Sequence, residues 1–244
     1  MFPTNYHSYR KVLVFDVETT GLIPKVNPVT KLPPPIEQYP HIIQLSYVKY
    51  NMYDHVIEEG YNAYINIPIT VEITPKITEL TGIRPEMCHS GSGQNIVDVL
   101  GKFYEAYQDC DCLVAHNVAF DTKMIDIELQ RNNDVLLKQN PNVLNIFKTE
   151  FDRFTMEKFC TMMSSIHSCG ILVTNIDKNG KTYTYKKFPK LSETYEHLFS
   201  KTPKDLHNSM MDTLVCLRCY LKMRHGVEID NSRFVYWVEK YMKM

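Results

Sequence analysis

One short segment, residues 11–16 with the sequence KVLVFD, constrains the fold of this chain more than any other. Its apolar and β-branched residues lie between polar neighbours, which is typical of a buried β-strand. Further strands are predicted at 42–50 and 61–67, as antiparallel partners of the first, and CLVAH at 112–116 predicts a short apolar strand. Strands that come first, followed by alternating helices and strands, indicate an α/β fold with a mixed central sheet flanked by helices.

Helices are predicted where apolar residues recur at helical spacing or where a capping residue begins a turn. Thr74 followed by Pro75 is a helix start, and Gly82 can take the left-handed conformation that ends this helix. The other predicted helices span 94–108, 121–131, about 154–165, 191–199 and 208–224, whereas 132–153 is polar and irregular.

Two insertions stand apart from this pattern. Residues 26–40 are rich in proline and predict a surface loop, because proline disrupts both helices and strands. Residues 170–189 predict a hairpin with Asn179-Gly180 at its turn. Because no linker or repeat is present, we expect one domain over 1–244, with a core at about 11–224 and a short C-terminal helix.

The composition, 44% hydrophobic residues and a formal net charge of −1, is that of an ordinary soluble chain. This charge does not itself indicate nucleic-acid binding, although bound divalent cations would supply positive charge. No apolar run reaches the ~18 residues that span a bilayer, and the first residues lack a signal-peptide pattern. We therefore expect an intracellular protein, cytoplasmic or nuclear, with no membrane contact.

The seven cysteines are an odd number without a small-scaffold framework, which indicates reduced thiols. Cys110-x-Cys112 and Cys216-x-x-Cys219 have the close spacing of zinc ligands. Neither has a second pair at matching spacing, so structural zinc is disfavoured.

Two acids, Asp16 and Glu18, lie at and just beyond the end of the first predicted strand. Side chains two positions apart in a strand share a face, so the carboxylates repel each other unless a cation lies between them. Carboxylate oxygens favour Mg²⁺ or Mn²⁺. Alone, D-x-E is more readily a solvated pair of acids. The full segment, FDVETTGL, adds two threonines and a glycine turn that lets the backbone approach a ligand.

Two later segments carry further acids. In HNVAFD, residues 116–121, a strand runs into a helix and Asp121 lies near the helix start. In His207-x4-Asp212, the acid lies near the start of the last long helix and the histidine lies just before it. Taken alone, each acid is readily a helix-start residue, and His207 a surface histidine.

In this order, FDVETTGL, HNVAFD and H-x4-D resemble the three exonuclease motifs of the DnaQ-like DEDDh family, which has an RNase H-like fold. Segments that also resemble the family are YPHIIQ (39–44), ITELTGI (77–83), FCTM (159–162) and LSETYEHLF (191–199). The similarity spans roughly residues 11–224. Departures are the two insertions, the long segment before the third motif and the stretch NSMM at 208–211.

The resemblance implies a 3′→5′ exonuclease that uses two divalent cations, Mg²⁺ or Mn²⁺. Asp16, Glu18 and Asp212 would hold the first ion, Asp16 would bridge to the second, and Asp121 would support the second. His207 would be the general base, since histidine is the side chain whose charge changes near neutral pH. The products would be a nucleoside 5′-monophosphate and a chain one unit shorter.

The resemblance also implies a set of substrate contacts. They are Thr19, Thr20, Leu22, Ile83, His116, Asn117 and Phe120. The threonines match positions near the 3′-terminal nucleotide, and the apolar residues match neighbours of the last base. Core packing is the competing interpretation for the apolar residues, and the histidine and asparagine can order the strand end instead.

Nucleic acid is the predicted partner, and DNA, as single strands or 3′ ends, is favoured because TTGL resembles DNA-degrading members. RNA is the alternative, since the same chemistry cleaves it. A proofreading subunit would dock a DNA polymerase through Phe234, Trp237 and Tyr241, which have amphipathic helical spacing, but packing of this helix on its own domain is favoured. A catalytically inactive binding module is a third alternative. Some family members are homodimers, and the Tyr-, Lys- and Asn-leaning composition is similar to that of proteins of large DNA viruses.

Overall fold

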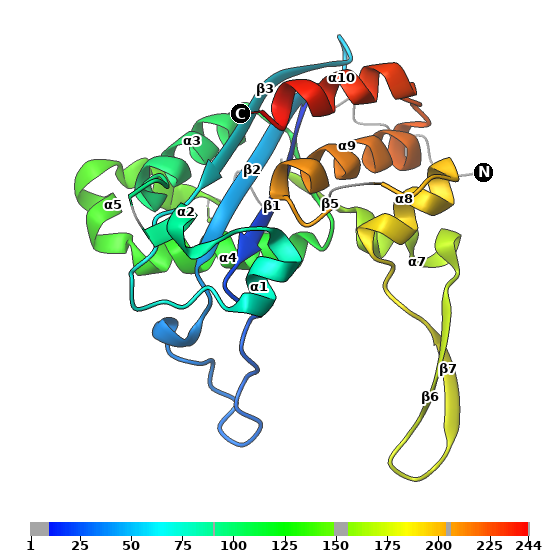
Figure 1. The fold of residues 1–244 in the computed structure, drawn as a ribbon, viewed down its shortest axis with the longest axis horizontal. Helices are drawn as coiled ribbons and strands as arrows, with labels where there is room; N and C mark the ends of the chain where they lie inside the picture. The colour runs from blue at the N-terminus through cyan, green and yellow to red at the C-terminus, as the bar shows by residue number, and fades with distance from the viewer. Residues whose placement is uncertain (1–9, 90, 149–155, 204–205, 244) are drawn as a thin grey trace.

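A five-stranded sheet forms the centre of the molecule in this computed structural model, which describes residues 10–89, 91–148, 156–203 and 206–243 (Figure 1). The strands are β1 (Lys11–Thr19), β2 (Ile42–Asn51), β3 (Val56–Tyr64), β4 (Cys112–Ala115) and β5 (Glu157–Cys160). Their order is β3-β2-β1-β4-β5. β1 pairs antiparallel with β2 and parallel with β4, so the sheet is mixed, as predicted.

The third strand differs from its prediction in position and in partner. β3 ends at Tyr64 instead of spanning 61–67, and it pairs with β2 and not with β1. Only residues 52–55 separate β2 from β3. A connection this short joins antiparallel neighbours, which leaves the other edge of β1 for β4.

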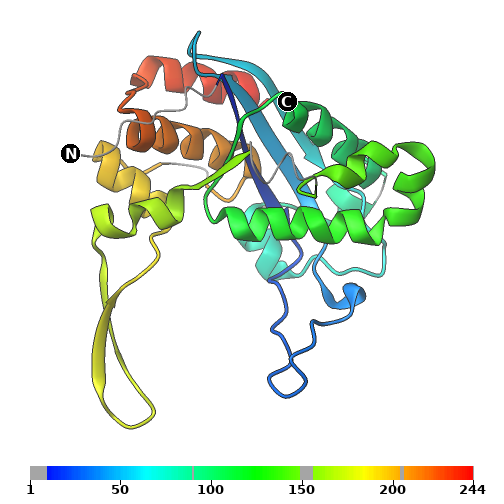
Figure 2. The same cartoon turned by 180° about the vertical axis from the view of Figure 1, so that it is seen from behind.

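Helices cover both faces of the sheet (Figures 1 and 2). They are α1 (Pro75–Thr81), α2 (Pro85–His89), α3 (Ile96–Gln108), α4 (Val118–Arg131), α5 (Asn133–Gln139), α7 (Thr161–Cys169), α8 (Leu191–Phe199), α9 (Ser209–His225) and α10 (Asn231–Tyr241). The predicted caps of α1 are confirmed: the Thr74 side chain accepts a hydrogen bond from the backbone N–H of Ile77, and Gly82 has a φ of 73°. No helix within the described ranges is long and apolar enough to cross a bilayer.

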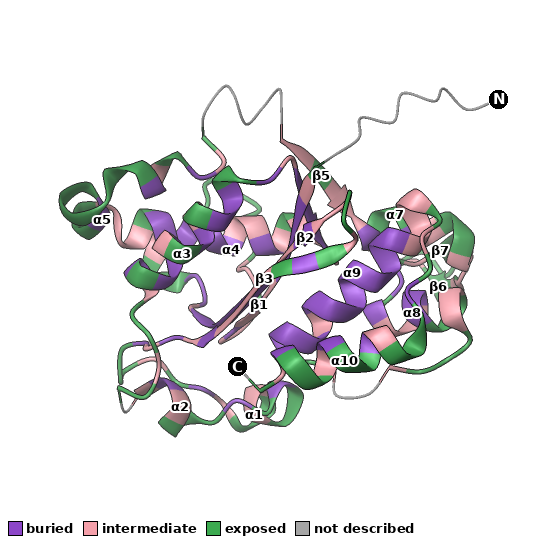
Figure 3. Ribbon diagram, turned by 90° about the horizontal axis from the view of Figure 1, so that it is seen from above, coloured by how far each residue is buried: buried purple, intermediate pink, exposed green. Residues whose placement is uncertain are grey.

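The alternation of side chains along β1 divides the core between the two faces of the sheet. Leu13, Phe15 and Val17 belong to an apolar cluster with residues of α3 and α4. Val12 and Val14 belong to a second cluster with residues of α9 and α10. α9 is buried along most of its length (Figure 3), and its buried apolar residues belong to that second cluster.

Two predicted segments between the second and third motifs were wrong. α5 lies within the stretch predicted to be irregular. Its sequence is too polar to predict a helix, but burial of Leu136 in the first cluster stabilises one. The predicted helix at about 154–165 is instead β5 followed by α7. A strand of four residues is too short for its periodicity to distinguish it from a helix. Residues 149–155, which these predictions also covered, lie outside the described ranges.

Both insertions project beyond the end of the sheet at which β1 finishes (Figures 1 and 2). The predicted loop at 26–40 is largely exposed and contains one short 3-10 turn at Ile36–Gln38. The predicted hairpin is confirmed as β6 (Leu172–Ile176) paired with β7 (Thr182–Lys186). Gly180 in its turn has a φ of 76°, a conformation that glycine takes readily.

Candidate active site

Asp16 and Glu18 lie on the face of β1 that α9 covers. Val12 and Val14 face α9, and alternate residues of a strand share a face, so the two acids continue the same row. The apolar part of the row packs on the helix, while both carboxylates are only partly buried. Glu18 lies where the pairing of β1 with β2 shifts register, between Glu18 and Thr19.

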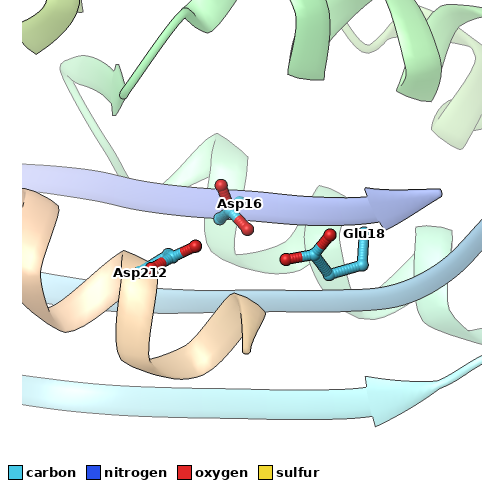
Figure 4. A group of neighbouring side chains, drawn as sticks. All are labelled: Asp16, Glu18 and Asp212. Atoms are coloured by element: carbon cyan, nitrogen blue, oxygen red, sulfur yellow. The ribbon is translucent and has the colours of Figure 1, made fainter. Parts of the chain in front are cut away.

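Asp212 approaches this row from the first turn of α9. The side chain of Asn208 caps the helix and accepts hydrogen bonds from the backbone N–H groups of Met210 and Met211. One carboxylate oxygen from each of Asp16, Glu18 and Asp212 lies within 4.8 Å of the others. Figure 4 shows the Asp212 carboxylate directed from the helix toward the two acids of β1.

Buried polar contacts hold the start of α9 on the sheet. The Ser209 hydroxyl donates to the carbonyl oxygen of Asp16 at 2.8 Å, and the Ser209 backbone N–H donates to Oε1 of Gln44 at 3.2 Å. The Gln44 amide donates in turn to Oδ1 of Asn62 on β3 at 2.9 Å. These contacts fix the position of Asp212 relative to β1. They were not predicted from the sequence, although Gln44, which lies between the apolar residues Ile43 and Leu45 of a predicted strand, is a readable signal.

Asp121 reaches the site from α4, which begins at Val118 and not at 121 as predicted. Asp121 therefore lies in the first turn of the helix, and it is only 3% exposed. Its Oδ1 accepts a hydrogen bond from the backbone N–H of Val17 at 3.2 Å. β4 pairs with β1 only as far as Val14, so the edge of β1 beyond that point is open to this side chain.

Burial is the main reason why the pKa of each of these four carboxyl groups lies above its usual range. Repulsion from Asp121, Asp212 and Glu18 raises the pKa of Asp16 further. The pKa of Glu18 and that of Asp121 rise to about 8. Without a cation the acids therefore retain protons near neutral pH, whereas a nearby positive charge would favour their ionised forms.

The donor set fits a divalent cation. Oδ1 of Asp212 is buried and accepts no hydrogen bond within the described part of the chain. A buried carboxylate oxygen without a partner is costly, and a hard cation is the partner that converging carboxylates favour. Asp16, Glu18 and Asp212 are also the only group of three or more His, Cys, Asp or Glu side chains with metal-binding spacing in the described ranges.

His207 contacts Asp212 through its backbone. Its N–H donates to Oδ2 of Asp212 at 3.2 Å. The φ of His207 is 72°, a left-handed conformation in which histidine is found more often than most residues. The side chain is exposed. The structure therefore brings His207 beside the acids and leaves its imidazole free of the core.

Comparison with known proteins identifies the family. Residues 13–220 match the RNase_T family, whose description is exonuclease. This chain belongs to the RNase_T exonuclease family. The match confirms the resemblance found in the three motifs, and it spans every predicted acid together with His207.

A curated relative of this RNase_T chain is the DNA polymerase III PolC-type of Bacillus subtilis (strain 168). The two are 31% identical over 163 residues, which is 64% of this chain and 10% of the relative. This chain thus corresponds to about a tenth of that protein.

Solved structures are similar in fold over most of this chain. Exonuclease I of E. coli, in complex with a dA16 oligonucleotide, has a TM-score of 0.53 and 17% identity over 93% of this chain and 42% of its own. A 3′-exonuclease, solved in a study of 3′-end recognition of histone mRNA stem-loop, has a TM-score of 0.58 and 15% identity over 91% and 66%. These similarities confirm the predicted RNase H-like fold.

His116, from the second motif, uses both ring nitrogens within the protein. Nε2 lies 3.0 Å from the carbonyl oxygen of Pro189 and must donate to it. Burial lowers the pKa of His116 to about 4, so the ring is neutral at neutral pH and Nδ1 accepts from the Thr161 hydroxyl at 2.9 Å. His116 thus joins the end of β4 to α7 and to the base of the hairpin. Its neighbour Asn117 has a φ of 78° at the start of α4.

The two threonines of the first motif differ in the hydrogen-bonding capacity that remains to them. The Thr19 hydroxyl donates to the carbonyl oxygen of Gly21 at 2.7 Å. The Thr20 hydroxyl instead accepts from the backbone N–H of His41 at 3.0 Å. Its own proton has no acceptor in the part of the chain that the structure describes, so it is available for a ligand.

The structure separates the three apolar residues that the resemblance implied as substrate contacts. Leu22 is 86% exposed, so core packing does not explain it. Ile83 is 1% exposed within a small cluster that includes Ile43, so its side chain is closed to a ligand. Phe120 is partly buried and packs against the first cluster.

An ion pair that the sequence analysis missed anchors the loop that carries Thr20 and Leu22. Arg131 contacts Glu128 at 2.5 Å and donates to the carbonyl oxygens of Tyr39 and Pro40 at 3.0 and 3.3 Å. Glu128 is 2% exposed. The end of α4 therefore holds the returning arm of the loop next to β2.

Proposed function

We propose that this chain is a metal-dependent 3′→5′ exonuclease that hydrolyses DNA from its 3′ end to nucleoside 5′-monophosphates. The observation that carries the proposal is the convergence of Asp16, Glu18 and Asp212, with Asp121 beside them, in a chain of the exonuclease family. One buried acid, Asp121, and three partly buried acids at one point repel one another and oppose folding unless they bind cations.

Two divalent cations, Mg²⁺ or Mn²⁺, would complete the site. Asp16, Glu18 and Asp212 would hold the first, and Asp16 with Asp121 would hold the second. When bound, such a pair of ions stabilises the charge on the attacking and leaving oxygens of an in-line displacement. The backbone N–H groups of Val17 and His207 donate hydrogen bonds to the carboxylates of Asp121 and Asp212, respectively. These bonds would hold the two carboxylates in place to bind the ions.

His207 would take the proton of the attacking water. Its backbone bond to Asp212 keeps it next to the acids, and its exposed side chain can turn toward the substrate. Leu22 would contact the terminal base, and Thr20 would donate its free hydroxyl proton to the terminal nucleotide. Replacement of His207 by Ala should lower kcat by about 10²–10⁴-fold, the usual contribution of a general base, with little change in KM.

The test is a digestion time course with 5′-labelled single-stranded DNA and matched RNA, each with Mg²⁺, with Mn²⁺ and with EDTA. We expect a metal-dependent ladder that shortens from the 3′ end, and none with Asp212→Asn. Asp134→Asn is the matched control, because Asp134 is an exposed acid in the first turn of α5. Undiminished activity in Asp212→Asn, or in EDTA, would contradict the proposal.

The same assay tests two alternatives. An exoribonuclease would digest the RNA faster than the DNA. A proofreading role beside a DNA polymerase is favoured by the 31% identity to the PolC-type polymerase, and it predicts that a mismatched 3′ end is removed faster than a matched one.

A further inference from the structure

The β6–β7 hairpin is an arm that the core does not require. Almost all of its residues are exposed on both faces of the two strands, and none of them belongs to any of the three apolar clusters found in the described ranges. A two-stranded hairpin without a packed face has little stability of its own. Its side chains are therefore free to serve a ligand.

The hairpin is strongly basic, although the chain as a whole has a net charge of −1. Residues 171–190 contain five lysines and one acid, Asp177. Asp177 accepts hydrogen bonds from the backbone N–H groups of Asn179 and Lys181 and so shapes the turn. Lys187 pairs with Glu193 at 2.5 Å, whereas Lys178 and Lys181 at the tip have no acidic partner in the described part of the chain.

Two tyrosines form an aromatic surface on one face of the hairpin. Tyr183 and Tyr185 are two positions apart on β7, and their rings stack with centroids 5.9 Å apart and an interplanar angle of 23°. They are 47% and 43% exposed. Asn175, opposite Tyr183 on β6, donates to the Tyr185 hydroxyl at 3.4 Å and steadies this face. Flat aromatic rings beside lysines are the combination on which unpaired bases stack.

The base of the hairpin is joined to the candidate active site. The carbonyl oxygen of Pro189, where the second arm ends, accepts a hydrogen bond from His116 at the end of β4. α4, which carries Asp121, begins directly after His116 and Asn117. The hairpin also projects beyond the same end of the sheet at which β1 delivers Glu18 (Figures 1 and 2).

The charge and the exposed rings point to one occupant, and we propose that the hairpin binds the single-stranded part of a nucleic acid upstream of the 3′ end under attack. Bases would stack on Tyr183 and Tyr185, and phosphates would lie near Lys178 and Lys181. A duplex fits this surface less well, because its bases are already stacked on one another. The inference rests on the proposed function for the end that is bound, but the binding itself requires no metal.

The first test measures affinity without catalysis. Fluorescence anisotropy of labelled oligothymidylate and oligouridylate of about 20 nucleotides, in EDTA, would compare wild type with Tyr183→Ala/Tyr185→Ala. We expect roughly a tenfold or greater loss of affinity for both oligomers, because base–aromatic stacking tolerates sequence. Tyr53→Ala/Tyr236→Ala, which removes two tyrosines that are 88% and 58% exposed on other elements, is the matched control.

The lysines give an independent readout. Removal of two phosphate contacts by Lys178→Ser/Lys181→Ser should reduce the slope of log K against log salt by about 0.7 for each contact. Unchanged affinity in the tyrosine variant, an unchanged salt slope, or no binding by the wild type would overturn the inference. A hairpin that instead joins two copies of this chain would appear as a dimer that the tyrosine variant dissociates without losing oligonucleotide affinity, which also overturns it.

Activity separates this inference from the proposed function. If the hairpin binds nucleotides upstream of those held in the acidic site, a dinucleotide leaves it unoccupied. The tyrosine variant should then hydrolyse the dinucleotide at the wild-type rate and lose efficiency only on the long oligomer. Wild-type hydrolysis of both substrates with no effect of the hairpin variants would refute the inference and leave the exonuclease proposal standing. No hydrolysis of any substrate, with hairpin-dependent binding in EDTA, would refute the exonuclease proposal alone.

Discussion

Each carboxylate of the acidic site opposes folding in the absence of metal. A carboxyl group whose pKa is higher in the folded than in the unfolded chain binds more protons when folded, so the free energy of unfolding decreases as pH rises through the interval between the two values. For Glu18 that interval runs from about 4.3 in the unfolded chain to about 8 in the folded chain. Stability without metal should therefore decline from acidic to mildly alkaline pH.

Replacement of Asp16 by Asn should relieve the repulsion of this carboxylate by Asp121, Asp212 and Glu18. At pH 8 in EDTA we expect a higher Tm than wild type, by about 2–4 °C for each kcal/mol of relieved repulsion, and a smaller difference at pH 5. Mg²⁺ should raise the Tm of wild type but not of the variant. Thermal unfolding at the two pH values, with Asp134→Asn as control, provides the measurement. A wild-type Tm that Mg²⁺ leaves unchanged would argue against a metal site.

Leu22 and Ile83 should respond in opposite ways to replacement by alanine. Ile83 is buried, so Ile83→Ala should cost about 2–5 kcal/mol of stability, the usual range for a large-to-small core substitution. Leu22 is exposed, so Leu22→Ala should change stability by less than about 0.5 kcal/mol and raise KM for a 3′-terminal substrate. Denaturant unfolding together with steady-state kinetics distinguishes the two. Equal stability losses would contradict the assignment.

At the scale of elements, α9 links the core to the chemistry. Its buried residues pack on the sheet, while its first turn carries Asp212 and is tied to β1 through Ser209. A change in how the helix begins should therefore alter the site even when the helix itself survives.

Loss of the α9 cap tests this link. Asn208→Ala removes the side-chain acceptor for two backbone N–H groups and should cost about 0.5–2 kcal/mol. In the equivalent cap of α10, the Asp230 side chain accepts a hydrogen bond from the backbone N–H of Arg233. Asp230→Ala removes this cap and should have a similar cost in stability. Only the first should lower kcat. Comparable kcat losses in the two variants, measured well below their Tm values, would mean that the start of α9 does not position Asp212.

At the scale of the whole molecule, α10 completes the second apolar cluster. Phe234, Trp237 and Tyr241 are 8%, 4% and 3% exposed, so the predicted packing of this helix on its own domain is confirmed. The Tyr241 ring occupies the space where a Cβ at Gly60 would lie. Truncation before α10 would therefore damage the fold and could not by itself reveal a polymerase contact.

Substitutions on the two sides of α10 separate stability from partner binding. Trp237→Ala should cost about 3–5 kcal/mol, as for other buried aromatic residues. Val235→Ser/Tyr236→Ser changes residues that are 51% and 58% exposed, so stability should be nearly unchanged. If α10 docks a polymerase, only the outer variant should lose co-purification while remaining folded. Retention of the complex in that variant would exclude this face as the docking surface.

Local pattern was enough to predict much of this protein. The strand at KVLVFD, the caps at Thr74 and Gly82, and the turn at Asn179-Gly180 each depend on a few adjacent residues, so the sequence alone determined them. The same holds for the order of the three motifs, from which the family followed. Periods of two and of 3.6 residues are local properties of the chain.

Tertiary structure alone decided the features that depend on residues distant in the sequence. The pairing of β3 with β2, the four-residue strand β5 and the helical state of α5 follow from neighbours that sequence spacing does not reveal. The same is true of the burial of Ile83 and the exposure of Leu22. From the sequence, both apolar residues were equally open to core packing or to substrate contact. The acidic site combines both contributions. The sequence supplied the carboxylates, but only the packing of α9 against β1 brings an oxygen of Asp212 within 4.8 Å of oxygens of Asp16 and Glu18. The start of α4 adds Asp121 at the edge of β1, so the site is a property of three elements and of no single segment.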